Sequence, residues 1–493
     1  MNRLPDHVLA DIQGFITSGY GHLSHAAYLF VQFHDAGKAQ RWLAGLAPAI
    51  TSSRPWPKVN GEKVKPSVTL NIAFTAEGLA ALGLPPQALC TFPPEFQEGI
   101  ASPLRSRILG DTEESDPLEW ELGGTGKPPI HAVLVVHATS EALEAACRAQ
   151  RTLLDEAGVG ELPGSMQSGH RPDGDYEPFG FHDGIAQPSI AGIPGDGVPT
   201  GEFVLGYPNH FQIIPPTPVV RAAFERDAVL SPLANPSHAS KPLRDLGING
   251  SYVVYSKLQQ DVAGFWQFMK REALRSVGSE DTDHMIWLAS RCVGRWPSGA
   301  PLVLAPGADD PRTSDRDDFL YGDDADGLAC PFGAYIRRTN PRDVIKPYAT
   351  AQSLSMSEAH RLLRRARVFG PALFDPAALT DPANVAGRKA VLELADDGHA
   401  RGIHFFCVNA SIRSQFEFVQ QTWCNNPRFS GLNDNKDPIL GDNARTDQAS
   451  SHMTIPRRPF RVRTAALPRF VKVRAGAYLF MPSLTALRFL AAL

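Results

Sequence analysis

Two short stretches of the sequence carry side chains whose types and spacing suit chemistry. In residues 177–192 (EPFGFHDGIAQPSIAG), the carboxylate of Asp183 lies between the apolar side chains of Phe181 and Ile185, and Gly184 allows tight backbone geometry beside it. A carboxylate in such surroundings is costly unless it caps a turn or serves a site. Two interpretations stay open on these residues alone, an Asx-turn between two strands or a functional loop.

The second stretch is residues 329–343 (ACPFGAYIRRTNPRD), where a tyrosine stands between apolar and cationic neighbours. Phe332 and Ile336 bracket Tyr335, and Arg337 and Arg338 follow at once. This pattern indicates a segment that binds a cofactor. It would be easier to explain with a histidine at position 335, so the role of Tyr335 is the main question that the sequence raises.

The composition describes a globular protein that is too long for a single core. The chain has 493 residues, 43% of them hydrophobic and 20% charged, so we expect two domains or a long duplicated one. A formal net charge of −4 offers no basic stripe, which makes DNA or RNA a poor partner. No window approaches the roughly 18 unbroken apolar residues of a membrane span, and no secretory signal is recognised. The six cysteines are scattered without a CxxC pair, so we expect reduced thiols in a cytoplasmic protein.

Short β-rich runs that are each followed by a helical pattern recur in both halves of the chain. In the first half, AAYLFVQF precedes a run of apolar residues at helical spacing, and Thr75 is placed to cap the helix after SVTLNIAF. In the second half, GSYVVYSKL and GIHFFCVN each precede a helical pattern. We therefore predict a duplicated α+β protein whose antiparallel sheets each bury one face under helices. We place the N-terminal domain at residues 1–225 and the C-terminal domain at residues 226–493.

The motifs resemble those of a known enzyme family in type and in order. GFHDG at residues 180–184 matches the GxxDG motif of the dye-decolorizing peroxidases. The resemblance extends over almost the whole chain, through DIQGFITSGYGHLSHAAYLF, GEFVLGYPN, INGSYVVYSKLQQDV, CPFGAYIRRTNPRD, HRLLRRARVFGP, RGIHFFCVNASIRSQFEFVQQTWCNNP and GAYLFMPS. It implies two ferredoxin-like α+β domains, with heme b between helices and sheet of the C-terminal one. It also implies an oxidoreductase that uses hydrogen peroxide to oxidise organic substrates.

By this resemblance, the distal face of the heme is assigned to Asp183 and Arg364. In the family the aspartate relays a proton between the two peroxide oxygens so that water leaves, which is general acid and base work. A distal arginine stabilises the charge that builds on the departing oxygen, and Arg364 in HRLLRRARVFG is the match. Arg365 and Arg367 lie close enough for a shifted register, and otherwise they belong to a basic, solvated helix end.

The resemblance also implies which residues contact the cofactor. Gly184 belongs to the distal loop, Arg364 faces the heme, and Arg337 and Arg338 accompany the family's proximal ligand, where a role at the heme propionates explains them. Some relatives carry a distal asparagine two positions after the arginine. Ala366 stands there in this chain, so that side chain is absent.

Tyr335 occupies the position of the family's proximal histidine, and three interpretations stay open. In the first, Tyr335 ligates the iron as a phenolate, as the proximal tyrosine of catalase does. If the segment is extended, Arg337 shares its face and supports that negative charge. In the second, His404 or His360 ligates the iron, and in the third the heme is lost. We favour the first, because the rest of the pocket still resembles a peroxide site.

A different class of function competes with the peroxidase. A heme carrier, or a catalase-like protein on the same fold, would show little peroxidase activity. A carrier should bind and release heme without turnover, whereas an enzyme should oxidise a dye or a phenol. The partners that we expect are hydrogen peroxide and an unidentified organic reductant, without nucleic acid or membrane, and an oligomer is compatible with the sequence.

Overall fold

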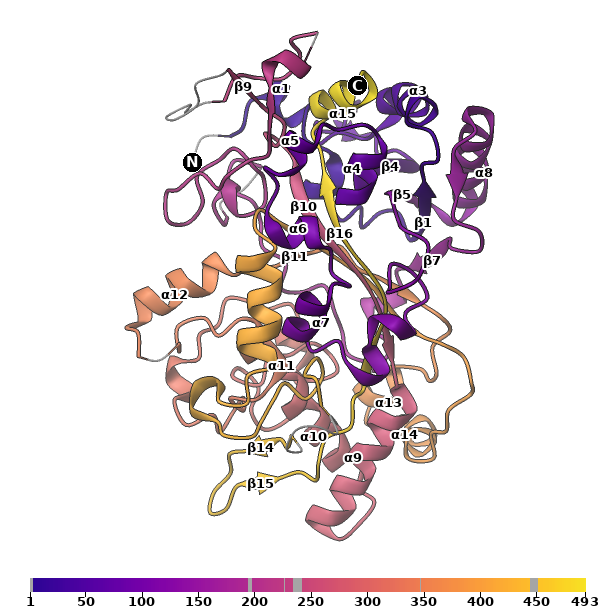
Figure 1. The fold of residues 1–493 in the computed structure, drawn as a ribbon. Helices are drawn as coiled ribbons and strands as arrows, with labels where there is room; N and C mark the ends of the chain where they lie inside the picture. The colour runs from indigo at the N-terminus through magenta and orange to yellow at the C-terminus, as the bar shows by residue number, and fades with distance from the viewer. Residues whose placement is uncertain (1–2, 194–196, 226, 234–241, 346, 444–450) are drawn as a thin grey trace.

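The centre of the protein is an antiparallel sheet that closes on itself (Figure 1). The computed structural model describes residues 3–193, 197–225, 227–233, 242–345, 347–443 and 451–493. The strands follow one another in the order β10-β16-β4-β5-β1-β7-β12-β13, and β13 pairs back to β10. The first half of the chain supplies β1 (His25–Gln32), β4 (Val68–Phe74), β5 (Ala132–Ala138) and β7 (Gln167–His170). The second half supplies β10 (Ser251–Gln260), β12 (Arg367–Phe369), β13 (Gly402–Asn409) and β16 (Val471–Met481).

The strands from the two halves meet at two narrow seams. β4 joins β16 only through Phe74 and Phe480, and β7 joins β12 only through His170 and Val368. Within each half the ladders are long, as in β10–β13, which runs over eight residue pairs. The predicted α+β class is therefore confirmed, whereas the division into domains at residues 225 and 226 stays a prediction.

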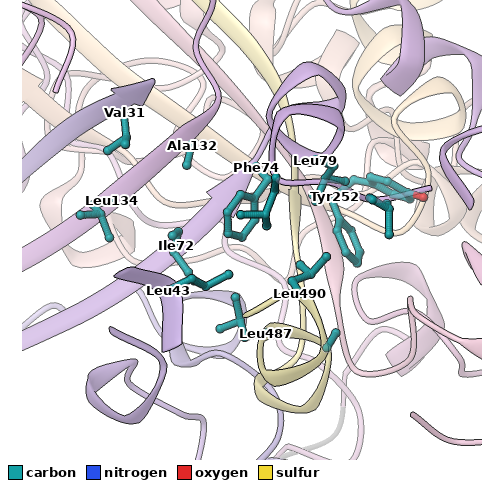
Figure 2. Close-up of a cluster of buried hydrophobic side chains, with 14 of the residues drawn as sticks. Val31, Leu43, Ile72, Phe74, Leu79, Ala132, Leu134, Tyr252, Leu487 and Leu490 are labelled. Carbon is teal, nitrogen blue, oxygen red and sulfur yellow. The ribbon is translucent and has the colours of Figure 1, made fainter. Parts of the chain in front are cut away.

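Helices cover one face of the strands of the first half and the end of the sheet beside them. They are α3 (Ala36–Leu46), α4 (Ala76–Ala81), α8 (Ser140–Ala157) and α15 (Leu484–Ala491). Figure 2 shows their core, where Leu43 of α3 and Leu487 of α15 approach Ile72 of the sheet. Thr75 caps α4 by accepting the N–H of Gly78, as the sequence predicts. The C-terminal helix thus packs with elements from the beginning of the chain.

A second helical layer lies at the other end of the sheet (Figure 1). It contains α9 (Val262–Val277), α10 (Thr282–Val293), α11 (Tyr335–Thr339) and α14 (Val385–Leu392). Phe265, Phe268 and Met269 of α9 are buried in its core, as their helical spacing predicts. No helix among the described residues has the length and apolar character needed to cross a bilayer.

Two local predictions are wrong. Residues 335–339 form a short helix rather than an extended segment, so Arg337 does not share the face of Tyr335, because helical neighbours on one face are three or four residues apart. Arg365 and Arg367 do not end a solvated helix either. Helix α12 (Thr350–Ala359) stops before them, β11 (Leu363–Arg364) and β12 pair with β13, and both arginines are buried.

Candidate active site

A cavity of about 270 Å³ is enclosed by the loop that carries Asp183, by the sheet and by helix α11. Apolar side chains of β10, β13 and β16 form much of its wall: Leu258, Ile403, Phe405, Val471 and Val473. Asp183, Tyr335 and Arg364 also line it. An apolar hollow with a few convergent polar groups is the usual form of a cofactor site.

Asp183 belongs to a tight loop that a buried carboxylate organises. Two backbone N–H groups of the loop donate to the Glu177 carboxylate at 3.0 Å, and Gln260 Nε2 donates to it at 2.7 Å. Burial raises the pKa of Glu177 to about 7 in spite of these hydrogen bonds. The N–H of Asp183 donates to the carbonyl of Asp175 at 2.8 Å, and Gly184 follows with a φ of +83°, which favours glycine. The backbone therefore fixes the loop and leaves the Asp183 side chain to the cavity.

Strand pairing decides which arginine faces the cavity. Successive side chains of β11 and β12 point to opposite faces, and Arg364 and Ala366 line the cavity. Arg365 instead donates to the carbonyls of Phe15 and Ile16 at 3.0 Å. Arg367 donates to backbone carbonyls of the segment just before β1. Of these three arginines, Arg364 is the one whose charge lies in the cavity.

Tyr335 begins helix α11 and meets Asp183 and Arg364 within the cavity. Its phenol and the Arg364 guanidinium lie close enough to act on each other electrostatically. Burial raises the pKa of Tyr335 to about 12, against the lowering effect of Arg364, and Asp183 adds to the rise. Burial by itself would lower the pKa of Arg364, but Tyr335 and Asp183 outweigh it and raise that pKa above its ordinary value. The three side chains therefore form one electrostatic cluster.

Arg337 and Arg338, which we expected at the cofactor, do not line the cavity. Arg337 donates to the Asp324 carboxylate at 2.8 Å. Arg338 donates to the carbonyls of Trp423 at 2.5 Å and Asn426 at 3.1 Å. Both guanidinium groups are buried and engaged in these contacts away from the cavity, so nothing here supports their assignment to the cofactor, which stays a prediction. They fix helix α11 to the loops around it.

Four arginines that the sequence did not single out line the cavity instead, Arg295, Arg469, Arg342 and Arg361, and the last two show how differently they are held. Arg342 is tied to Asp317, whose backbone carbonyl accepts its Nη1 at 2.8 Å. Arg361 lines the cavity with a guanidinium for which the described residues supply no hydrogen bond, and burial lowers its pKa. Both lie in stretches where several arginines follow one another, and the chain alone does not tell which of them turn inward.

The alternative histidine ligands do not reach the cavity. His404 alternates along β13 with Ile403 and Phe405, and these two residues line the cavity while His404 does not. Its Nδ1 lies 3.2 Å from the Tyr255 hydroxyl. His360 stacks on a phenylalanine ring with ring centroids 3.8 Å apart, outside the cavity lining. Neither His404 nor His360 is therefore placed to ligate an iron in this cavity.

A second, more open cleft of about 630 Å³ adjoins the cavity at Asp183 and Arg364, which line both. His182 also lines both, and it is the only histidine of the cavity wall among the described residues. An ion pair between Arg171 and Asp175 lies on the wall of the cleft. The cleft offers a small polar molecule a path to the Asp183 carboxylate.

The residues of the cavity fit a heme. Apolar walls suit a porphyrin ring, and the uncommitted guanidinium of Arg361 suits a propionate. The Tyr335 phenol supplies an oxygen of the kind that ligates ferric heme in catalase. The chemistry of this set of residues is therefore that of a heme site with an acid and a cation beside it.

The comparisons with known proteins point to one group of enzymes. The family model described as "DyP dimeric alpha+beta barrel domain" matches residues 11–161. Peroxidase 2 of Mycetinis scorodonius is 30% identical, over 97% of this chain and 87% of that protein. A dye-decolorizing peroxidase of Exidia glandulosa is 29% identical, over 97% of this chain and 86% of that protein. The solved structure of an ancestral D-type dye decolorizing peroxidase is similar at a TM-score of 0.74 and 26% identity, over 97% of this chain and 98% of that one.

Proposed function

The chain belongs to the dye-decolorizing peroxidases, heme enzymes that use hydrogen peroxide to oxidise organic substrates, and we propose that it binds heme b with Tyr335 as the iron ligand. One observation carries the proposal. Tyr335, Asp183 and Arg364 line the same apolar cavity, and the phenol lies next to the charged pair. A peroxidase needs a ligand for iron, a proton carrier and a fixed positive charge at one place.

Three side chains of the cavity wall are of the kinds that ligate heme iron, Tyr335, Tyr321 and His182, and of these Tyr335 stands at the position of the family's proximal ligand. His182 is the chain neighbour of Asp183, so as a ligand it would occupy the side of the ring that the acid needs. Tyr335 comes from helix α11 and leaves that side to Asp183. With heme bound, the Tyr335 phenolate would hold the iron and the Arg364 guanidinium would be left to act on the peroxide.

The residues around the cofactor divide the work on peroxide. When bound, heme supplies the iron that takes up the oxidising equivalents of the peroxide. A carboxylate oxygen of Asp183 accepts the proton from the inner peroxide oxygen and gives it to the outer one, so that water is the leaving group. The Arg364 guanidinium stabilises negative charge on the outer oxygen. The loop around Glu177 holds the acid in place before the reaction begins.

The absorption spectrum of the purified protein, with its heme content, tests the proposal. We expect heme in equimolar amount and a ferric phenolate spectrum. We also expect resistance to reduction by dithionite, because an anionic phenolate favours the ferric state. A protein without heme, or with an imidazole-type spectrum, would contradict it. Peroxide-dependent oxidation of a dye by the same sample distinguishes the peroxidase from a heme carrier, which would bind heme without turnover.

A further inference from the structure

One wall of the cavity carries a buried carboxylate that the peroxide chemistry does not use. Asp111 follows helix α7 (Pro103–Leu109), lines the cavity and is only 7% exposed. Its carboxylate has no hydrogen bond or ion pair within the part of the chain that the structure describes. A buried carboxylate normally has such partners, because an unsatisfied one is costly. Asp111 is therefore placed to accept a hydrogen bond from a molecule in the cavity.

The backbone around Asp111 is anchored, so the position of the carboxylate is defined. The Arg469 guanidinium donates to the carbonyls of Gly110 at 3.3 Å and Thr112 at 2.9 Å, on either side of Asp111. Ser115 Oγ accepts the N–H of Val473 at 3.1 Å, which ties the same loop to β16. These contacts use backbone carbonyls and a hydroxyl and leave the acid itself unengaged.

Asp111 is also electrostatically separate from the group around Tyr335. Burial raises the pKa of Asp111 to about 7, Arg469 lowers it, and Asp442 and Asp116 raise it. After burial, the charges that act most on Tyr335 are Arg364 and Asp183, whereas those that act on Asp111 are Arg469, Asp442 and Asp116. The carboxylate thus belongs to a different corner of the cavity from the acid and cation that act on peroxide.

The surroundings of this corner select a class of ligand. Leu109, Leu440 and Val473 give it apolar walls. The arginines that line the cavity outnumber its acids, which disfavours a cationic ligand, and an anionic ligand would be repelled by Asp111 itself. A neutral aromatic molecule that carries a hydroxyl group can pack its ring on the apolar walls and donate a hydrogen bond to the Asp111 carboxylate.

We propose that Asp111 binds the hydroxyl group of a phenol reductant and takes up its proton as the phenol is oxidised. The inference rests on the proposed peroxidase function, of which phenol oxidation is an expected activity, and adds the residue that receives the phenol in the same cavity. Each phenol loses one electron and the proton of its O–H bond and becomes a neutral phenoxyl radical. Two phenols together supply two electrons and two protons, which convert one hydrogen peroxide into two waters. Near neutral pH an acid of this kind can both accept a proton and release it again.

Asp111→Asn tests the proposal, because it keeps the size of the side chain and removes the proton acceptor. Two electron donors are compared on the heme-loaded protein with hydrogen peroxide, guaiacol, which has a phenolic proton, and ferrocyanide, which has none. We expect kcat/KM for guaiacol to fall roughly 10- to 100-fold, and its rise with pH near neutrality to disappear. The value for ferrocyanide should change less than about twofold, since no proton leaves that donor. Equal losses for both donors, or an unchanged rate with guaiacol, would overturn the proposal.

Glu119→Gln is the control, since it removes an exposed charge shortly after the same loop, outside the cavity lining, and should behave like the wild type with both donors. Calorimetric binding of guaiacol to the purified protein separates this proposal from the proposed function. Weaker binding of guaiacol by Asp111→Asn than by the wild type supports the phenol site. If the wild type oxidises neither donor, the peroxidase proposal is contradicted, and the binding result still supports the phenol site. Equal binding by the two proteins overturns the phenol site.

Discussion

The wall of the cavity that carries Asp183 and Arg364 is built differently from the wall that carries Tyr335. On the first wall, backbone hydrogen bonds of a tight loop and of paired strands fix the chain, and the side chains of Asp183 and Arg364 line the cavity. On the second wall, side chains fix helix α11, because the guanidinium groups of Arg337 and Arg338 donate hydrogen bonds to neighbouring loops. Tyr335 is the group that this wall presents to the cavity.

The comparison shows what decides the role of a buried arginine in this protein. An arginine carries five N–H donors, and once backbone carbonyls accept them it is a structural element. Arg338 and Arg365 are of that kind, whereas Arg361 and Arg364 keep their charge in the cavity. Residues of the first kind should affect stability when replaced, and residues of the second kind should affect the reaction.

The largest effect is expected on the wall that carries the proposed iron ligand. Tyr335→Phe should lose bound heme, because the ring stays and the ligand oxygen is removed, and heme absorbance per protein measures this. Tyr335→His should restore an imidazole-type spectrum and raise peroxidase activity. Tyr321→Phe is the matched control, since Tyr321 also lines the cavity and its hydroxyl has no hydrogen bond among the described residues. A Tyr335→Phe protein with heme and an unchanged spectrum would make His182 the next ligand to test.

Asp183→Asn tests the opposite wall. The exchange keeps the size of the side chain and removes the proton carrier, so cleavage of peroxide should slow by roughly 10²-fold or more while heme stays bound. Stopped-flow absorbance after mixing with peroxide measures the rate. Asp315→Asn removes an exposed acid from the wall of the open cleft and should have little effect. Reaction of the Asp183→Asn protein at the wild-type rate would reduce Asp183 to a turn residue.

Arg364→Leu should slow the same step by roughly 10²-fold, because the fixed positive charge beside the departing oxygen is lost. Heme content has to be measured in parallel, so that a slower reaction is not caused by an emptier site. A normal reaction of Arg364→Leu, together with loss of the reaction on replacing Arg365 or Arg367, would contradict the assignment of Arg364 to the reaction.

The smallest effect is expected where an arginine is already engaged. Arg365→Met removes the donors to Phe15 and Ile16, so the free energy of unfolding should fall by about 2 kcal/mol, while the reaction with peroxide stays near its wild-type rate. Urea unfolding, followed by fluorescence, measures the first quantity. Unchanged stability combined with a slow peroxide reaction would show that Arg365, and not Arg364, acts in the cavity.

The features that the sequence predicted are those that depend on neighbours in the chain. The helical spacing of α3 and the cap at Thr75 are local, and so is the order of the strand and helix signals that gave the α+β class. The resemblance to a family singled out Asp183, Arg364 and Tyr335, and the cavity that contains all three depends on chain folding that no single motif describes.

The features that the sequence could not predict depend on distant partners. The carbonyls that engage Arg338 belong to residues 423–435, and nothing in the stretch RRTNPRD indicates them. The alternation of His404 with Ile403 was visible in GIHFFCVN, but which face meets the cavity follows only from closure of the sheet. Asp111 could not be recognised as a cavity residue from the sequence, because a single acidic residue after a short helix is common.

The strand that closes the sheet also bears on how the protein is made. β16 pairs with β10 on one side and with β4 on the other, and it is the last strand of the sheet in chain order. Until residues 471–481 have left the ribosome, β10 keeps a bare edge, which is a template for pairing with other nascent chains. The closed ring therefore protects the folded sheet from strand addition, whereas a nascent chain is exposed to it until β16 has been made.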